Sequence, residues 1–141
     1  DYPVVESNDA PIFREIVEHV LDVHHIQDIC FLTGHKEYKI SEERLQIFKE
    51  VMEERGLTVK PEQIVYGDFW YSSGTKLAER ILSGEIPKPG AVICASDHMA
   101  IGLARKLSEN GVNIPKDMII TNVLYNVFPM CIHWPKRTKT R

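Results

Sequence analysis

The chain has 141 residues, of which 43% are hydrophobic and 26% are charged, and this ordinary composition excludes a disordered or fibrous protein. Its longest unbroken apolar run, Ala91 to Ala95, is far shorter than the roughly 20 residues that a transmembrane helix needs, so we expect no membrane-spanning segment. Seventeen Lys and Arg stand against twenty Asp and Glu, and because four of these cations fall in the last six residues, the rest of the chain is more acidic than its net charge of −3 and poorly suited to bind nucleic acid directly.

Segments with helical and with strand-like periodicity alternate along the chain. Helices are predicted where apolar residues recur every three or four positions, and strands where a short apolar run is bounded by turn residues. In chain order, the predicted elements are a helix capped by Asp9, a strand over residues 28–33, a helix from about Ser41 to Gly56, a strand over residues 63–66, a helix through Leu77 that ends at Gly84, a strand over residues 91–95, a helix capped by Ser96 or Asp97 that closes at Gly111, and a strand over residues 117–121. Four alternations with short connections are typical of right-handed crossovers, so we predict an α/β fold with a doubly wound parallel sheet flanked by helices in three α/β/α layers.

The pattern stops after Thr121. Residues 122–141 contain prolines and basic residues and fit neither period, and we expect an atypical tail that is altered or disordered. The folded unit is therefore predicted to span residues 1–121. Because the chain begins with Asp1 and not with Met, we also expect a fragment of a longer protein.

Cysteine usage indicates the compartment. Cys30, Cys94 and Cys131 cannot all pair within one chain, and the first two lie in apolar runs, as buried free thiols do. We therefore expect a reducing, cytoplasmic setting without a secretory signal.

Ligands of open parallel sheets bind beyond the carboxyl ends of the strands. In this chain those ends read Thr33-Gly34-His35, Asp68-Phe69-Trp70-Tyr71 and Ser96-Asp97-His98. The set contains no Gly-rich phosphate loop with a lysine and no nucleophile elbow. Ser96, Asp97 and His98 supply the groups of a catalytic triad, but neighbours in the first turn of a helix point in different directions, so a helix N-cap is favoured. We expect neither a catalytic residue nor a cofactor, and His24-His25 alone offers too few ligands for a metal.

Two features favour a ligand site. Arg44 is expected in the first turn of its helix, where the helix dipole disfavours a cation, and it shares the apolar stripe of Phe48. A ligand clamp and an arginine that merely snorkels at the edge of the stripe fit this spacing equally well. Phe69, Trp70 and Tyr71 follow a strand directly, and although one or two of them can plug the core, three consecutive side chains cannot all turn inward. An arginine and an aromatic plate facing one crevice suit a flat polar ligand such as a sugar or a nucleobase.

These residues together resemble the effector-binding domain of LacI-family transcription regulators, which share the periplasmic-binding-protein fold. The likeness covers residues 3 to about 121 and rests on stretches in a specific order: Glu18-His19-Val20-Leu21 through His25 to Ile29-Cys-Phe-Leu-Thr-Gly34, Glu43-Arg44-Leu45 with Phe48, Gly67-Asp68-Phe69 with Ser73-Gly74, Val92-Ile-Cys-Ala-Ser-Asp97 with Met99-Ala-Ile-Gly102, and Gly111 with Ile114-Pro115-Lys-Asp117.

The resemblance implies a sensor of two α/β lobes with a small effector between them, an N-terminal helix-turn-helix that reads operator DNA, and a homodimer. This chain resembles mostly the second lobe and lacks the DNA-binding head, so operator DNA is reached only through a domain absent from it. Arg44 matches the family's effector-gripping arginine, Phe69 its stacking aromatic, and Ser96, next to Asp97, a polar ligand-facing position. Leu124 stands where the family has a ligand-facing aspartate.

We therefore predict the sensor lobe of a bacterial regulator that binds a sugar-like or nucleobase-like effector through Arg44, Phe69, Trp70, Ser96 and Asp97, without enzymatic activity. A lobe that serves dimerisation or signalling for a different output domain is the first alternative. An enzyme on a hydrolase-like or phosphatase-like α/β fold is the second, because doubly wound sheets host many functions.

Overall fold

The computed structural model describes residues 10–122 of the chain. The cap predicted at Asp9, the family departure at Leu124 and the tail from residue 123 onward lie outside this range. Asn122, which the sequence assigned to the tail, is the last residue of a strand.

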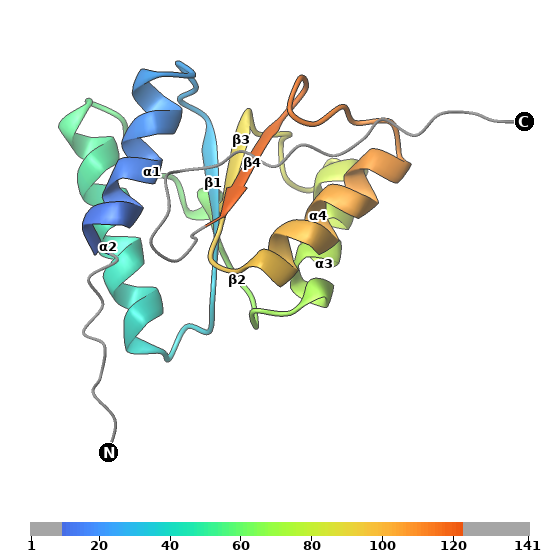
Figure 1. The fold of residues 1–141 in the computed structure, drawn as a ribbon, viewed down its shortest axis with the longest axis horizontal. Coiled ribbons are helices and arrows are strands. Elements are labelled where there is room, and N and C mark those ends of the chain that lie inside the picture. The colour runs from blue at the N-terminus through green and yellow to red at the C-terminus, as the bar shows by residue number, and fades with distance from the viewer. Residues whose placement is uncertain (1–9, 123–141) are drawn as a thin grey trace, which may run out of the picture.

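Four helices, one 3-10 turn and four strands make up the described part, close to the predicted order (Figure 1). The elements are α1 (Ala10–Asp22), β1 (Ile29–Thr33), α2 (Lys39–Glu54), η1 (Pro61–Gln63), β2 (Ile64–Tyr66), α3 (Tyr71–Ser83), β3 (Ala91–Cys94), α4 (Asp97–Glu109) and β4 (Ile119–Asn122). None of the helices between residues 10 and 122 is long and apolar enough to cross a bilayer.

The strands form one parallel sheet in the order β2-β1-β3-β4. β1 lies in the middle, where Phe31 is opposite Ile64 of β2 on one side and Ile93 of β3 on the other. All five residues of β1 are buried, as expected of a strand covered by helices on both faces. The predicted doubly wound α/β fold with three layers is thereby confirmed.

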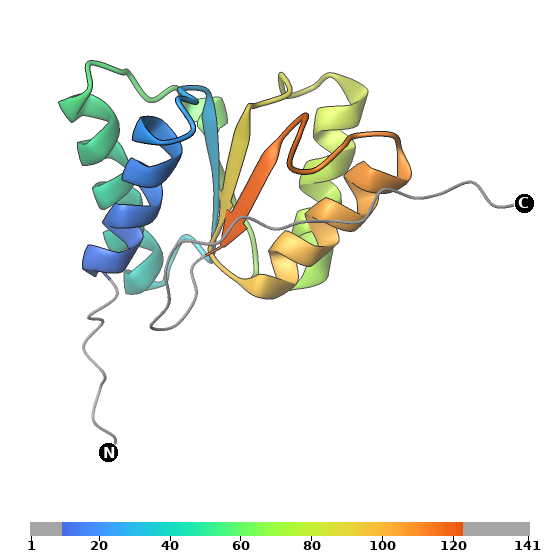
Figure 2. The ribbon, with the colours of Figure 1, turned by 45° about the horizontal axis from the view of Figure 1, so that its top comes forward.

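Each face of the sheet has its own apolar core. α1 and α2 cover one face, where Phe13, Phe31 and Phe48 pack ring against ring with centroids 5.2 and 5.5 Å apart. α3 and α4 cover the other, which Leu77 and Leu103 help to fill (Figure 2). Side chains of β1 alternate between the two cores, so this strand joins both layers.

α3 and α4 approach each other closely because glycines lie at their contact. A Cβ at Gly74 would overlap the carbonyl oxygen of Met99 and lie 2.6 Å from the amide nitrogen of Leu103. A Cβ at Gly102 would overlap the carbonyl oxygen of Tyr71. Since α3 starts at Tyr71 and α4 at Asp97, this contact places the two helix N-termini side by side at one edge of the sheet.

Helix α2 begins earlier than the sequence predicted. It starts at Lys39 and not at Ser41, with Tyr38 at the N-cap and no side-chain cap hydrogen bond. Arg44 therefore lies in the second turn of α2, where the helix dipole has little effect. The prediction that Arg44 lies in the first turn of its helix was wrong.

Candidate functional site

The strand order creates a switch point between β1 and β3. After β1 the chain turns to α2 on one face of the sheet, and after β3 it turns to α4 on the other (Figure 2). The diverging connections leave a crevice beyond the carboxyl ends of these strands, the usual ligand position in such sheets. A depression of about 580 Å³ lies there, and seven residues line it: His35, Tyr38, Asp68, Phe69, Trp70, Ser96 and His98.

Phe69 has an unusual backbone conformation in this pocket. Its φ is +73°, in the left-handed region that bulky residues rarely adopt. Two contacts stabilise it there: the hydroxyl of Ser96 donates a hydrogen bond of 2.9 Å to the Phe69 carbonyl, and the ring lies over Gly34, where any Cβ would overlap it. Strained residues of this kind cluster at binding sites, where the strain fixes a side chain in place.

An aromatic wall forms around this ring. Tyr38 stacks on Phe69 with ring centroids 5.8 Å apart and ring planes inclined by 22°, and Tyr38 itself is 52% exposed. The imidazole of His35 lies 5.1 Å from the Tyr38 ring and 6.4 Å from the Phe69 ring. The wall presents a flat, polarisable face with a hydroxyl and an imidazole at its margin, which suits a planar or ring-shaped polar ligand.

A second aromatic group lies at the N-termini of α3 and α4. The rings of Trp70 and Tyr71 meet the imidazole of His98 edge-on, at 5.2 and 4.9 Å between centroids. Trp70 is 59% exposed, so its indole is available to a ligand or to a facing protein surface.

Asp68 supplies the negative charge of the pocket. The hydroxyl of Ser73 donates to its carboxylate, and the amide of Trp70 donates to the same oxygen at 2.9 Å. These bonds, with that of Ser73 first, hold the pKa of Asp68 below its usual range. The carboxylate is therefore charged at neutral pH and also fixes the turn that carries Phe69.

The groups of Ser96, Asp97 and His98 do not form a catalytic triad. The Ser96 hydroxyl caps α4 by accepting the amide of Met99 at 3.2 Å, and its proton goes to the Phe69 carbonyl. The Asp97 carboxylate accepts a hydrogen bond from the Asn122 amide. His98 meets aromatic rings, so each of the three groups has a separate partner. The predicted N-cap at Ser96 is confirmed.

The structure brings together some of the predicted binding residues and separates others. Phe69, Trp70 and Ser96 line one pocket, whereas Asp97 is exposed beside it and bonded to β4. Arg44 is half-buried on α2 and is not among the lining residues.

Sequence reasoning left four lining residues out of the predicted set: His35, Tyr38, Asp68 and His98. Three of these stood in the strand-end stretches and could have been chosen from their position at the carboxyl edge. Tyr38 carried no signal, because its helix was expected to begin three residues later. Between residues 10 and 122, no three His, Cys, Asp or Glu side chains gather closely enough to hold a metal ion.

Comparison with known proteins gives a consistent family. The profile described as "Periplasmic binding protein-like domain" matches residues 17–126. The HTH-type transcriptional repressor PurR of Vibrio vulnificus is 35% identical over 103 residues, which are 73% of this chain and 30% of that protein. Catabolite control protein A of Priestia megaterium is 33% identical over 107 residues, 75% of this chain and 32% of that protein.

Solved structures agree. The Escherichia coli transcriptional repressor ascG superposes with a TM-score of 0.73 and 27% identity, over 82% of this chain and 41% of that one. A sugar-binding transcriptional regulator of the LacI family from Escherichia coli, in complex with phosphate, superposes with a TM-score of 0.68 and 26% identity, over 83% of this chain and 44% of that one. The chain spans about a third of the length of the curated relatives and about two fifths of these solved chains.

Proposed function

Since the chain belongs to the periplasmic binding protein-like family, as an effector-binding domain of a LacI-family transcription regulator, we propose that it is the lobe that senses a small sugar-like effector. The observation that carries the proposal is the stacked pair of Tyr38 and Phe69 inside a pocket with polar margins at the switch point of the sheet. A sugar ring presents an apolar face to such a wall and hydroxyls to its rim.

The polar groups of the pocket fit this ligand class. The Asp68 carboxylate accepts hydrogen bonds from hydroxyls, and the imidazoles of His35 and His98 both donate and accept them. A relative in the same family is described as sugar-binding, which supports the choice. A nucleobase-like effector is the second candidate, because the same flat wall stacks equally well on a planar base.

Arg44 and Asp97 remain proposed contacts of the complete cleft. Arg44 is half-buried one and a half turns after Tyr38 on α2, and its guanidinium has the reach of a long side chain. In the complete regulator we expect Arg44→Ala to weaken effector binding by more than about twofold. A smaller change in titration calorimetry would remove Arg44 from the binding set.

The activity of the whole protein follows from its other parts. Because relatives carry the name "HTH-type" and this chain covers about a third of their length, we infer that a DNA-binding head encoded outside this chain contacts operator DNA, as part of a cytoplasmic homodimer. The effector acts by binding one closure of the two lobes better than another, since only differential affinity shifts such an equilibrium. Residues 1–121 are proposed as the part of this sensor domain that the chain supplies.

A thermal-shift screen tests the proposal. Hexoses, hexose phosphates and nucleobases are added separately to the complete regulator and to the 141-residue chain. A ligand at 100 times its dissociation constant stabilises a protein by about 2.7 kcal/mol, or several degrees for a domain of this size. We expect a hexose to raise the Tm of the complete regulator, and a nucleobase that does so instead would favour the second candidate.

Two variants connect the shift to this pocket. Phe69→Ala is expected to lower effector affinity about fivefold or more, since one aromatic contact contributes roughly 1 kcal/mol. Tyr66→Ala removes an exposed aromatic side chain on β2, outside the lining, and is expected to leave affinity unchanged. Equal losses in both variants, or no shift with any compound, would refute the proposal. Turnover on a panel of esters and phosphoesters would support the enzyme alternative. A dimer that binds none of the ligands would support the dimerisation alternative.

A further inference from the structure

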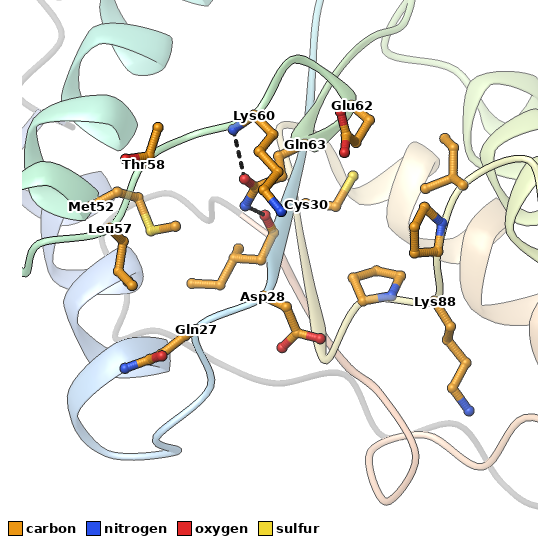
Figure 3. Close-up of a pocket in the computed structure, with 14 residues that line it drawn as sticks. Gln27, Asp28, Cys30, Met52, Leu57, Thr58, Lys60, Glu62, Gln63 and Lys88 are labelled. Atoms are coloured by element: carbon orange, nitrogen blue, oxygen red, sulfur yellow. Dashed lines mark hydrogen bonds between the residues drawn. The ribbon is translucent and has the colours of Figure 1, made fainter.

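The sheet has a second hollow at its opposite, amino-terminal edge (Figure 3). Its volume is about 290 Å³, at the lower end of the range of small-molecule pockets. The pairing register explains it: β2 begins with Ile64 opposite Phe31, so Ile29 and Cys30 at the start of β1 have no strand beside them on that side. The hollow lies where β2 would otherwise continue.

Hydrogen bonds fix one wall of the hollow. The side-chain amide of Gln63 donates to the Ile29 carbonyl at 2.8 Å, and its oxygen accepts the backbone amide of Lys60 at 2.7 Å (Figure 3). The turn η1 is thereby tied to the start of β1 through a side chain. On the other side, Pro87 and Pro89 stiffen the loop that leads to β3. The hollow is therefore a fixed part of the fold.

The inner surface of the hollow is apolar. Met52 and Ile86 are almost fully buried, and Leu57 is half-buried. Cys30 is also a lining residue and is almost fully buried, and this burial raises the pKa of its thiol to about 12 and keeps it neutral. This part of the hollow suits a small apolar or aromatic group.

The rim carries charges of both signs. Lys60 and Glu62 lie on one side of the hollow, and Asp28 and Lys88 lie on the other (Figure 3). Within residues 10–122 none of these four side chains forms an ion pair, whereas Arg14, Arg55 and Arg80 all do. Two lysines and two carboxylates, all four exposed, thus stand around the opening of the hollow.

From this arrangement we propose that the amino-edge hollow binds a small zwitterion with an apolar body, of the class of free α-amino acids with an apolar or aromatic side chain. Such a ligand buries its side chain over Cys30 and Ile86, presents its carboxylate to a lysine, and presents its ammonium to a carboxylate of the rim. A ligand of a single charge can pair with only one kind of rim group, whereas a zwitterion pairs with both, and electrostatic complementarity therefore favours the zwitterion.

Three compounds with one aromatic body test the charge requirement. L-phenylalanine, 3-phenylpropionate and phenethylamine are titrated separately into the ¹⁵N-labelled chain, and amide shifts are followed by NMR. We expect L-phenylalanine to shift the amides of Lys60, Gln63 and Ile86 saturably, with those of His35 and His98 unchanged. The two singly charged analogues are expected to bind at least about threefold more weakly.

Charge-removing variants complete the test. Lys60→Gln and Glu62→Gln are both expected to weaken L-phenylalanine binding, by about three- to fivefold each. Lys76→Gln and Glu79→Gln on α3 serve as matched controls, because both side chains are exposed and lie outside the hollow. If Glu62→Gln instead tightens binding and 3-phenylpropionate binds as well as L-phenylalanine, the hollow is an anion site and the proposal is wrong. Absence of saturable shifts with all three compounds would also overturn it.

Discussion

The left-handed backbone of Phe69 gives a sharp prediction about strain at the pocket that we propose for the effector. At φ +73° a Cβ of any kind costs about 1–2 kcal/mol in the folded state, whereas glycine has no such cost. We therefore expect Phe69→Gly to be more stable than Phe69→Ala, although both lose the same ring contacts. The free energy of unfolding is measured by urea denaturation with circular dichroism.

The magnitude follows from two opposing terms. Glycine raises the entropy of the unfolded chain, which destabilises it by about 0.4–1 kcal/mol relative to alanine at an unstrained position. Subtracting this from the strain leaves Phe69→Gly ahead of Phe69→Ala by about 1 kcal/mol. With a urea m-value of 1–3 kcal/mol/M, typical of small proteins, the midpoints differ by about 0.3–1 M.

Val59 provides the control. It is half-buried in a loop like Phe69, but its φ is negative. Val59→Gly is expected to be less stable than Val59→Ala by about 0.4–1 kcal/mol, so the order of the two variants reverses between the sites. If alanine is also the more stable substitution at Phe69, the backbone there is not strained, and the link between strain and ring placement fails.

Three further predictions concern the supports of the site. Gly74→Ala forces a Cβ into the Met99 carbonyl and should lower the free energy of unfolding by about 2 kcal/mol, even after a gain of about 1 kcal/mol in helix propensity. We expect this change to lower the Tm by several degrees, whereas the control Thr75→Ala on the same helix should leave the Tm nearly unchanged. Ser96→Ala removes the cap of α4 and the bond to the Phe69 carbonyl, and should cost about 1–2 kcal/mol in urea denaturation, whereas an unchanged midpoint would mean that water replaces the hydroxyl. The pKa of Asp68 is lowered in the folded state, chiefly by the Ser73 hydroxyl. The charged carboxylate therefore stabilises the fold above the usual aspartate pKa of about 3.9, and this stabilisation is lost as the pH falls below that value. Asp68→Asn should make the Tm depend less on pH in this acidic range, and an unchanged dependence would contradict the assignment.

Most of the fold could be predicted because its signals are local. Short apolar runs at residues 28–33 and 91–95 and the helical spacing between them indicate parallel strands without any knowledge of long-range contacts. The first residues of the helices were harder to predict. α4 begins directly after Ser96, which caps it, and the sequence predicted this start, whereas Tyr38 and Trp70 precede α2 and α3 without any side-chain cap hydrogen bond. Sequence rules that search for Ser, Thr, Asp or Asn miss such starts.

The proposed binding residues divide in the same way. Phe69 and Trp70 could be chosen because they follow a strand directly, and position at the carboxyl edge is a topological property that the sequence carries. The conformation of Phe69 could not be predicted, since a left-handed backbone is normally signalled by glycine or asparagine. It depends on Gly34 and Ser96, which are distant in sequence and meet the aromatic residue only in the folded chain.

The two hollows lie at opposite ends of β1, and this arrangement limits how strongly they can influence each other. Ile29 and Cys30 line the amino-edge hollow, and the chain leaves the other end of β1 at Thr33 to reach His35 in the proposed effector pocket. Between them every residue of β1 is buried and paired with β2 or β3, so the strand has one packed arrangement. Coupling between sites requires an element with two arrangements that both ligands bias. An amino acid in the amino-edge hollow would therefore change effector affinity only by altering how this lobe meets another part of the regulator, and the amide shifts of His35 and His98 in the isolated chain should not respond to it.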